Sequence, residues 1–562
     1  MKKTLIHLFF WLTIPALAQQ PTYKNGVVVS AHPIASEIGT DIMKKGGNAM
    51  DAAVAVQFTL SVTLPIAGNI GGGGFLVYRG ADGKTDALDF RETAPGAATE
   101  TMYLDAAGNP IENLSIHGAL ASGVPGTVDG MVQAHQKYGK LSWTEVLQPA
   151  VELAENGFPL TEAQAGELNF NYERFNDWNP EGTAFTQRRN WKKGDLLIQK
   201  ELAETLKLIQ KQGRSGFYEG KTAAFIVDEM KRGNGIISLK DLKNYKAVWR
   251  KPVTGNYKDY KIISMPPPSS GGIALISLLH SVEDYPLNEY GFQSENAVQI
   301  MVEAERRVYA DRSEYLGDPD FVEVPLEELL SKENSAERMK TFSFDHATPS
   351  SEVKPSVFEY NESMQTTHFS VIDKDGNAVS VTTTLNGAFG SFVVVKNAGF
   401  LLNNEMDDFS IKPGVPNLYG LTGGAANAIQ PGKRMLSSMT PTIVEKNGKP
   451  FMVLGTPGGS TIITSVFQTF LNVVEFDKSL QEAVSLPRFH HQWLPDKVFV
   501  EKGAISEIVR QQLTNKGYQF VNQSPWGWTD GTWGRMDAIL IHPDGTYEGA
   551  ADPRGDDAVM GY

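Results

Sequence analysis

The sequence predicts an α+β fold built in layers rather than a strictly alternating, doubly wound sheet. Runs of strand character occur near the beginning of the chain and again beyond residue 366, whereas residues 140–250 carry mainly helical periodicity. The 562 residues are 41% hydrophobic, which is normal for a globular protein with a large core. Strands and helices that occur in separate runs are typical of an α+β sandwich.

The first part of the chain predicts a strand, two helices and a second strand. The run "NGVVVSAHP" is strand-like, and the Ala-rich residues 34–62 predict two helices broken at Gly46 and Gly47. The Gly-rich run "GNIGGGGFLVYRG" is predicted to form a turn that leads into a strand ending near Tyr78.

The middle of the chain is predicted to be helical. The segments "KELAETLKLIQKQG" and "GKTAAFIVDEMKRGNG" each end at a glycine stop signal. The run "MPPPSSGGIAL" predicts a rigid loop that enters a helix, and a long amphipathic helix is expected to end before Pro319. From about 332 to 363 the sequence is polar without a clear period, so we expect an exposed, mobile segment there.

Residues 363–386, "SMQTTHFSVIDKDGNAVSVTTTLN", predict a β-hairpin. Phe369 and Val371 alternate with polar residues, as do Val379 and Val381 on the partner strand, and "KDGN" offers an Asp-Gly turn. A two-residue loop would set Thr367 opposite Thr384, whereas a loop one residue longer would set Thr366 there. Threonine is also simply a good strand residue, so the pairing alone does not establish a role. Beyond the hairpin, "TPTIV" and "PFMVLGTPGGS" predict further strands.

The N-terminus resembles a secretory signal. It has a basic start, the apolar run "LIHLFFWLTIP", and an Ala16-Leu17-Ala18 cleavage site, so we expect residues 1–18 to be removed and the protein to be periplasmic or secreted. The formal net charge of −14 argues against partners such as nucleic acid or anionic membranes. The sequence contains no cysteine, which excludes a thiol nucleophile, Cys-ligated zinc and iron–sulfur clusters.

Several familiar catalytic motifs fail on spacing. "GFYEGKT" has three residues between its glycines where a P-loop needs four, and "GNIGGGGF" leads into a strand instead of out of one. "DKDGNAVS" departs from the spacing of a calcium loop, and neither H-E-x-x-H nor G-x-S-x-G occurs. The hairpin threonines remain as the candidate nucleophiles.

An N-terminal threonine would supply both a nucleophile and its base. A threonine hydroxyl is weak without an adjacent base, and an α-amino group with a pKa of about 7.7–8.0 is well matched to neutral pH. Cleavage between Gln365 and Thr366 would create such a residue. We therefore predict attack of the Thr366 hydroxyl on the Gln365 carbonyl, followed by hydrolysis of the resulting ester.

The sequence resembles the γ-glutamyltransferase (γ-glutamyltranspeptidase) family of N-terminal-nucleophile hydrolases. The motifs that carry the resemblance are "GGNAMDAAVA", "GNIGGGGF", "DFRETAP", "MPPPSSGG" and "YADRSEYLGDPDF", then "TTHFSVIDKDGNAVSVTTTLN", "LLNNEMDDFSIKPGVPN", "SSMTPTIV" and "GTPGGS". They run in order from about Val27 to Tyr562. The resemblance implies an αββα four-layer sandwich, with a large subunit 19–365 and a small catalytic subunit 366–562 interwoven in one core.

The resemblance also implies roles for individual residues in catalysis. Thr366 would be the nucleophile and Thr384 would orient it by a hydrogen bond. Gly458 and Gly459 would offer backbone N–H groups to the oxyanion, although a Gly-Gly pair is also a common turn. Tyr419, in the run "KPGVPNLYGLTGG", would stand at the gate of a lid loop, and His368 receives no catalytic role.

A second set of residues is implied to bind the donor. Arg91 would bind the α-carboxylate with help from Ser437 and Ser438. The ammonium group would be met by Asn386, Glu405 and Asp408. Two simpler interpretations remain open from the residues alone: Arg91 could be exposed and paired with Glu92, and "NEMDD" could be an acidic helix start.

Together with the predicted N-terminal threonine, the resemblance implies a two-step acyl transfer. Thr366 would take the γ-glutamyl group of glutathione or a related compound and pass it to water, an amino acid or a peptide, without a metal or organic cofactor. One alternative is an acylase that acts on glutaryl-type side chains or poly-γ-glutamate. Another is an exported homologue that binds γ-glutamyl compounds without turnover and stays uncut.

Overall fold

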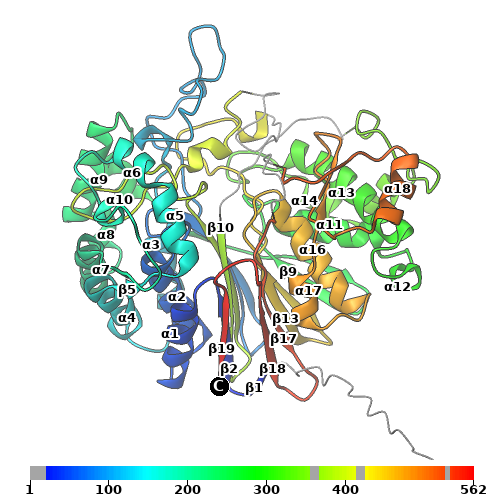
Figure 1. Ribbon diagram of the computed structural model, residues 1–562, viewed down its shortest axis with the longest axis horizontal. Helices are drawn as coiled ribbons and strands as arrows, with labels where there is room; N and C mark the ends of the chain where they lie inside the picture. The colour runs from blue at the N-terminus through cyan, green and yellow to red at the C-terminus, as the bar shows by residue number, and fades with distance from the viewer. Residues whose placement is uncertain (1–20, 355–365, 413–424, 526–531) are drawn as a thin grey trace, which may run out of the picture.

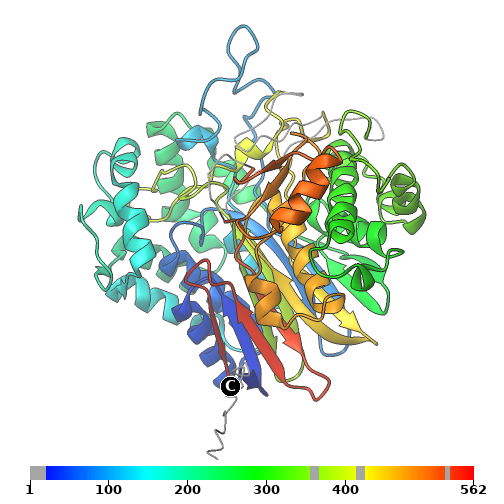
Figure 2. The same ribbon diagram turned by 45° about the vertical axis from the view of Figure 1, so that its right-hand side comes forward.

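Two seven-stranded sheets packed face to face form the centre of the computed structural model (Figure 1). The structure describes residues 21–354, 366–412, 425–525 and 532–562. Within each sheet every pair of neighbouring strands is antiparallel. A layer of helices covers the outer face of each sheet, so the predicted α+β four-layer sandwich is confirmed (Figure 2).

The first sheet interleaves strands that lie before and after position 366. Its spatial order is β19 (Ala558–Gly561), β2 (Gly26–Ser30), β10 (Thr366–Asp373), β11 (Ala378–Thr384), β3 (Gly73–Arg79), β4 (Thr85–Asp89) and β7 (Val248–Arg250). The predicted hairpin therefore lies in the middle of the sheet, with β2 on one side and β3 on the other.

The second sheet is interleaved in the same way. Its spatial order is β1 (Thr22–Tyr23), β18 (Tyr547–Ala551), β17 (Asp537–Ile541), β13 (Lys449–Gly455), β12 (Thr442–Lys446), β9 (Tyr260–Ser264) and β8 (Val253–Tyr257). The two sheets share an apolar layer to which Val29, Phe75, Ile443 and Ile539 contribute. Smaller sheets are formed by β5 (Phe158–Pro159) with β6 (Leu196–Leu197), and by β14 (Phe489–His490), β15 (Val498–Val500) and β16 (Phe520–Val521).

The helices on the outer side of the first sheet precede position 366. They are α1 (Pro33–Lys44), α2 (Ala49–Thr63), α3 (Thr127–Tyr138), α4 (Trp143–Asn156), α5 (Glu162–Phe170), α6 (Tyr172–Trp178), α7 (Lys200–Gln212), α8 (Ser215–Tyr218), α9 (Gly220–Arg232) and α10 (Leu239–Asn244). The break at Gly46 and Gly47 is confirmed, and α2 begins with a capping box between Asn48 and Asp51. Every residue of α2 is buried, which explains why its sequence is apolar on all sides.

The helices on the outer side of the second sheet come from both parts of the chain. They are α11 (Gly271–Val282), α12 (Leu287–Tyr290), α13 (Glu295–Tyr315), α14 (Leu326–Leu329), α15 (Lys332–Met339), α16 (Thr461–Val474), α17 (Leu480–Ser485) and α18 (Glu507–Asn515). Short 3₁₀ helices are η1 (Ala119–Ala121), η2 (Ala184–Thr186), η3 (Glu405–Asp408) and η4 (Ala425–Asn427). Among the helices of the described ranges, none combines the length and hydropathy required to cross a membrane.

The segment predicted to be exposed and mobile at about 332–363 does expose many of its described residues, but it also contains regular structure that the sequence analysis did not predict. Residues Lys332–Met339 form α15, whose N-terminus is capped by the Ser331 hydroxyl. Further on, the Trp493 indole donates to the carbonyls of Ser350 and Val353, at 3.0 Å each. Partners distant in the chain thus fix a polar segment that shows no periodicity of its own. Residues 355–363 lie outside the described ranges.

Candidate active site

The hairpin brings Thr366 directly opposite Thr384. The strands pair in the register Thr366↔Thr384 through Ile372↔Ala378, so the longer of the two possible loops is the one observed. The Asp373 carboxylate sets this length, because it accepts from the backbone N–H groups of Asp375 at 2.9 Å and Asn377 at 3.0 Å. Opposite residues of an antiparallel pair point to the same face, so the two threonines lie side by side.

Strand alternation directs both threonines toward the second sheet. Ile372 and Ala378 belong to the layer between the sheets, and the hydroxyl of Ser370 donates to the carbonyl of Asp537 on β17. Counting back by twos places Thr366 and Thr384 on this same face. Both are buried, at 4% and 3% exposure.

His368 is buried and uncharged, and it fills space between the two sheets rather than serving as a catalytic base. Its Nδ1 lies 2.9 Å from the Thr382 hydroxyl and its Nε2 lies 3.1 Å from the Ser370 hydroxyl. Burial lowers the pKa of His368 to about 3. Its ring lies against Gly455, where a Cβ atom would overlap the imidazole. The end of β13 therefore approaches β10 closely, two residues from Thr366.

A glycine turn leaves this end of β13 and enters α16. Gly458 and Gly459 have φ values of +132° and +52°, which L side chains rarely adopt. A Cβ atom at Gly458 would also lie 2.8 Å from the Thr461 hydroxyl. Backbone N–H groups at the N-terminus of a helix favour negative charge. The turn, which follows the end of β13 that packs against His368, is therefore suited to binding an oxyanion.

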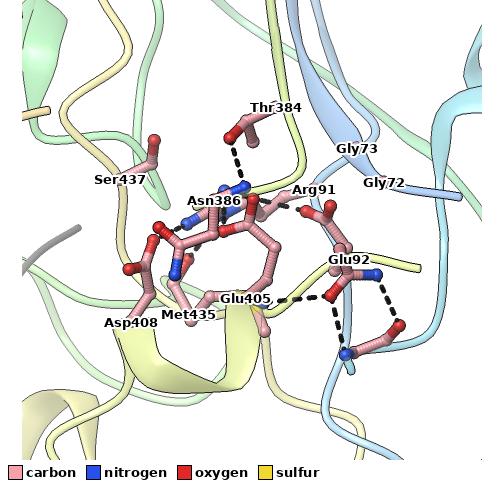
Figure 3. Close-up of polar contacts among 12 residues, drawn as sticks. Gly72, Gly73, Arg91, Glu92, Thr384, Asn386, Glu405, Asp408, Met435 and Ser437 are labelled. Carbon is pink, nitrogen blue, oxygen red and sulfur yellow. Dashed lines mark hydrogen bonds and ion pairs between the residues drawn. The ribbon is translucent and has the colours of Figure 1, made fainter. Parts of the chain in front are cut away.

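Arg91 lies at the centre of a buried acidic cluster (Figure 3). Its Nη1 lies 2.7 Å from Glu405 and 3.7 Å from Glu92, and its Nη2 contacts Asp408. Its Nε and Nη2 also donate to the carbonyls of Met435 at 3.3 Å and Leu436 at 3.0 Å. The side chain is 1% exposed, so Arg91 does pair with Glu92 but is not the exposed arginine of the simpler interpretation.

The charge of this cluster is unbalanced. In the described part of the chain, three buried carboxyl groups surround the guanidinium: Glu92, Glu405 and Asp408. Burial raises the pKa of Glu92 and of Asp408 well above the ordinary value, and it also raises the pKa of Glu405. Burial opposes the charge on Arg91, but the neighbouring carboxylates more than offset this and raise its pKa. A ligand that carries an ammonium group would place a positive charge against this excess of carboxyl groups.

Asn386 joins the threonine pair to this cluster. Its backbone N–H donates to the Thr384 hydroxyl at 2.7 Å, and its side chain donates to the carbonyl of Asn404 at 2.9 Å. Asn404 precedes η3, whose residues include Glu405 and Asp408. The "NEMDD" run is thus a short 3₁₀ turn that points acidic side chains inward, not the acidic start of an α-helix.

Ser437 and Ser438 lie on the segment that follows the carbonyls bound by Arg91, and Figure 3 shows Ser437 at the edge of the cluster. The Ser437 N–H donates to the carbonyl of Pro268 at 3.0 Å. The Ser438 hydroxyl accepts from Arg312 at 3.1 Å. The structure therefore brings together the predicted residues Thr384, Asn386, Arg91, Glu405, Asp408 and Ser437, with Ser438 adjoining them.

The Gly-rich run before β3 supports the site in a way that the sequence analysis missed. Asn69 donates to the carbonyl of Thr384 at 2.8 Å and accepts from the Gly72 N–H at 3.1 Å. A Cβ atom at Gly72 would collide with the carbonyl of Thr384, and one at Gly73 would lie 2.6 Å from Glu92. These glycines permit close backbone approach. An unusual density of glycines before a strand was the available signal.

Asn403 was also missed. Its side-chain oxygen accepts from the N–H groups of Glu405 at 3.0 Å and Gly123 at 2.9 Å, which fixes the start of η3. Two predicted residues, Gln365 at the cleavage position and Tyr419 at the lid position, lie outside the described residues, as does the signal segment 1–18.

Comparison with known proteins connects this geometry to one family. The sequence pattern of the family described as Gamma-glutamyltranspeptidase matches residues 35–562. A curated relative, the Glutathione hydrolase proenzyme of Escherichia coli (strain K12), is 48% identical over 542 residues, which cover 96% of this chain and 92% of the relative.

Solved structures agree with this match. The crystal structure of cephalosporin acylase from Bacillus halodurans is similar with a TM-score of 0.81 at 25% identity, covering 99% of both chains. The crystal structure of Helicobacter pylori gamma-Glutamyltranspeptidase is 47% identical with a TM-score of 0.57, covering 58% of this chain and 94% of that chain.

Proposed function

Because the chain belongs to the γ-glutamyltranspeptidase family of N-terminal-nucleophile hydrolases, we propose that it is an exported glutathione hydrolase and γ-glutamyltransferase whose nucleophile is Thr366. The observation that carries the proposal is the buried set of three carboxyl groups around Arg91, next to the paired threonines. The curated relative named above is a glutathione hydrolase proenzyme, which supports both the substrate and a maturation step.

Maturation is proposed to occur by cleavage between Gln365 and Thr366. The Thr366 hydroxyl attacks the Gln365 carbonyl, the peptide C–N bond breaks, and the acyl group moves to oxygen while the nitrogen becomes an amine. Water then hydrolyses the ester, which frees the carboxylate of Gln365 and the hydroxyl of Thr366. The products are a large chain 19–365 and a small chain 366–562. The interleaved sheets would hold these chains together.

The charged groups of the donor are proposed to pair with opposite charges in the site. A γ-glutamyl group ends in an α-ammonium and an α-carboxylate. The ammonium would lie against Asp408 and Glu405 with Asn386 nearby, and the carboxylate would bind the Arg91 guanidinium and the serine hydroxyls. On binding, the contact between Arg91 and Asp408 would be replaced by two salt bridges to the ligand, one from Arg91 and one from Asp408. The donor brings one charge of each sign, so each of its charged groups would meet an opposite charge in the site, which lessens the cost of burying them.

Catalysis is proposed to proceed in two transfers. The free amine of Thr366 takes the proton of its own hydroxyl, directly or through one water, while the oxygen attacks the γ-carbonyl. The N–H groups of Gly458 and Gly459 stabilise the tetrahedral oxyanion. Collapse of this intermediate gives a γ-glutamyl ester and releases the amine product with the proton. Water, an amino acid or a peptide then attacks the ester by the same route.

The likeness to a cephalosporin acylase keeps an acylase as the second candidate. A glutaryl-type donor lacks the α-ammonium and would leave Asp408 and Glu405 without a charge partner. Rates with γ-glutamyl and glutaryl anilides of matched leaving group separate the two candidates. We expect γ-glutamyl to be preferred by more than about tenfold, since a hydrogen bond to a charged group is worth about 1.5–3 kcal/mol.

The proposal is tested by N-terminal sequencing and intact mass of the wild type, Thr366→Ala and Thr367→Val. Thr367 is a matched control, because its hydroxyl is buried with no hydrogen-bond partner among the described residues and faces the helix layer. We expect the wild type and Thr367→Val to yield a chain that begins at residue 366. Thr366→Ala should stay uncut and inactive. A fully active enzyme with an intact chain would refute the nucleophile assignment and favour a different mechanism.

A further inference from the structure

Arg312 is a buried arginine that contacts the serine pair from behind. It lies in the last turn of α13 and is 2% exposed. Its Nη2 donates to the Ser438 hydroxyl at 3.1 Å, and its Nε donates to the Ser270 hydroxyl at 2.9 Å. The proposed mechanism above uses Ser438 but assigns nothing to the arginine.

The second contact extends to Ser437 through the loop that precedes α11. The Ser270 hydroxyl donates to the carbonyl of Ser437 at 2.8 Å, and the Ser270 N–H donates to the same carbonyl at 2.7 Å. The guanidinium therefore binds one serine of the pair directly and the other through Ser270. Its planar fork can hold two hydroxyl groups in fixed directions, which the single ammonium of a lysine does not do.

The direction of these hydrogen bonds determines what Ser438 can do. A guanidinium only donates, so the Ser438 oxygen is the acceptor in its contact with Arg312. The proton of this hydroxyl therefore points to some other acceptor. A hydroxyl that accepts from a cation is also a stronger donor, because hydrogen bonds in a chain polarise one another. An anionic ligand group is the acceptor that such a hydroxyl favours most.

We propose that Arg312 is a positioning residue for the α-carboxylate of the donor. It fixes Ser438 as a hydrogen-bond donor, aligns Ser437 through Ser270, and places a second positive charge behind the pair. This inference rests on the proposed γ-glutamyl specificity. It predicts that Arg312 contributes to recognition of the carboxylate and not to the acyl-transfer steps.

The same helix offers a contrast one turn earlier. The Tyr309 hydroxyl donates to the carbonyl of Ser460, the residue after the glycine turn. Tyr309 thus supports the oxyanion side of the site, whereas Arg312 supports the carboxylate side. A defect at Tyr309 should lower kcat for every donor, but a defect at Arg312 should depend on the donor's carboxylate.

The test compares two donors that differ in one group. One is a γ-glutamyl anilide with a free α-carboxylate, and the other carries an α-carboxamide in its place. For Arg312→Lys and Arg312→Gln we expect kcat/KM with the carboxylate donor to fall about 10- to 100-fold, mainly through KM. With the carboxamide donor we expect a change of less than about threefold. Rates are normalised to the amount of processed chain.

Arg307→Lys is the matched control. Arg307 is on the same helix and is 1% exposed, but it binds Glu303 and the Thr341 hydroxyl, at 2.8 Å for the latter, rather than the serines. This variant should leave the ratio of the two donors unchanged. Should the Arg312 variants not accumulate as processed enzyme, Ser438→Ala reads the same contact and should show the same selective loss.

The comparison of the two donors has three distinguishable outcomes. A selective loss with the carboxylate donor supports the proposal, and the loss in the double variant Arg312→Gln/Ser438→Ala should then be smaller than the product of the two single losses. An equal loss with both donors, in either the Arg312 or the Ser438 variant, overturns it and assigns the arginine to general packing. A wild-type enzyme that does not prefer the carboxylate donor overturns the proposed γ-glutamyl function itself, and the inference about Arg312 with it.

Discussion

The hydroxyl of Thr384 provides a sharp test of how the hairpin builds the site. It accepts the N–H of Asn386 at 2.7 Å and stands opposite Thr366. Thr384→Val keeps the shape and the strand preference of the side chain. It leaves the buried N–H of Asn386 without this acceptor, which costs about 1–3 kcal/mol of folding free energy.

The neighbouring Thr383 serves as the control for this loss. Its hydroxyl donates to the carbonyl of Gly73 at 2.8 Å and accepts from Asn69 at 3.1 Å, but it faces the helix layer. Thr383→Val should therefore destabilise the protein by a similar amount, since it also removes a buried hydroxyl. The two variants differ in the face of the strand that they alter.

Their effects on turnover should differ. We expect Thr384→Val to lower kcat about 100-fold, because a nucleophile displaced by about 1 Å loses roughly that factor, with little change in KM. Thr383→Val should stay within about threefold of the wild type. Thermal unfolding and steady-state kinetics on processed enzyme measure both quantities. Equal kcat values in the two variants would show that the cross-strand hydroxyl does not orient Thr366.

Three further predictions concern the glycine turn, the arginine and a buried histidine. Gly459→Ala, at a residue with φ +52°, should lower kcat about 10²- to 10³-fold. The control Gly448→Ala, at φ +73° in a turn with open space around it, should affect stability alone. Similar kinetics in the two variants would argue against the oxyanion role. Arg91→Lys keeps the charge but loses the fork, so KM for an α-carboxylate donor should rise about tenfold or more, and an unchanged KM would contradict this assignment. Burial lowers the pKa of His368 from 6.5 to about 3. The unfolded chain therefore takes up a proton below pH 6.5 that the folded chain does not, and this part of the stability is complete above pH 6.5 and is lost as the pH falls toward 3. His368→Gln should reduce the pH dependence of unfolding by about 1.4 kcal/mol per pH unit between roughly pH 6 and 4, as measured by denaturant titration; slopes identical to the wild type would show that His368 is protonated in the fold.

The local sequence pattern, namely strand alternation and an Asp-Gly turn, predicted the hairpin but left the register of its strands open. Alternation fixes which residues share a face, and the Asp-Gly pair fixes where the chain turns. The loop length depends on the Asp373 carboxylate, which binds the turn and also accepts from the N–H of Ala49 at the start of α2, at 2.9 Å. That contact spans 324 positions, so no local rule could supply it.

The same limit applies to the groups that support the site. Arg312 appears in the sequence as one charge on an amphipathic helix, and its contact with Ser438 spans 126 positions. His368 received no catalytic role from the sequence, and its packing against Gly455 depends on how the two sheets stack. The predicted ligands Arg91, Glu405 and Asp408 came from motif resemblance. Their common burial, and the excess of carboxyl groups among them, required the assembled fold.

Because both sheets alternate strands from before and after position 366, each of these two parts of the chain depends on the other for its folded structure. Each sheet would lose three or four of its seven strands if one half were withdrawn. The remaining half would expose apolar faces of both sheets, so neither half would be stable as a separate folded unit. If the chain is cut between Gln365 and Thr366 as proposed, the two products should therefore stay together and should not exchange with those of other molecules.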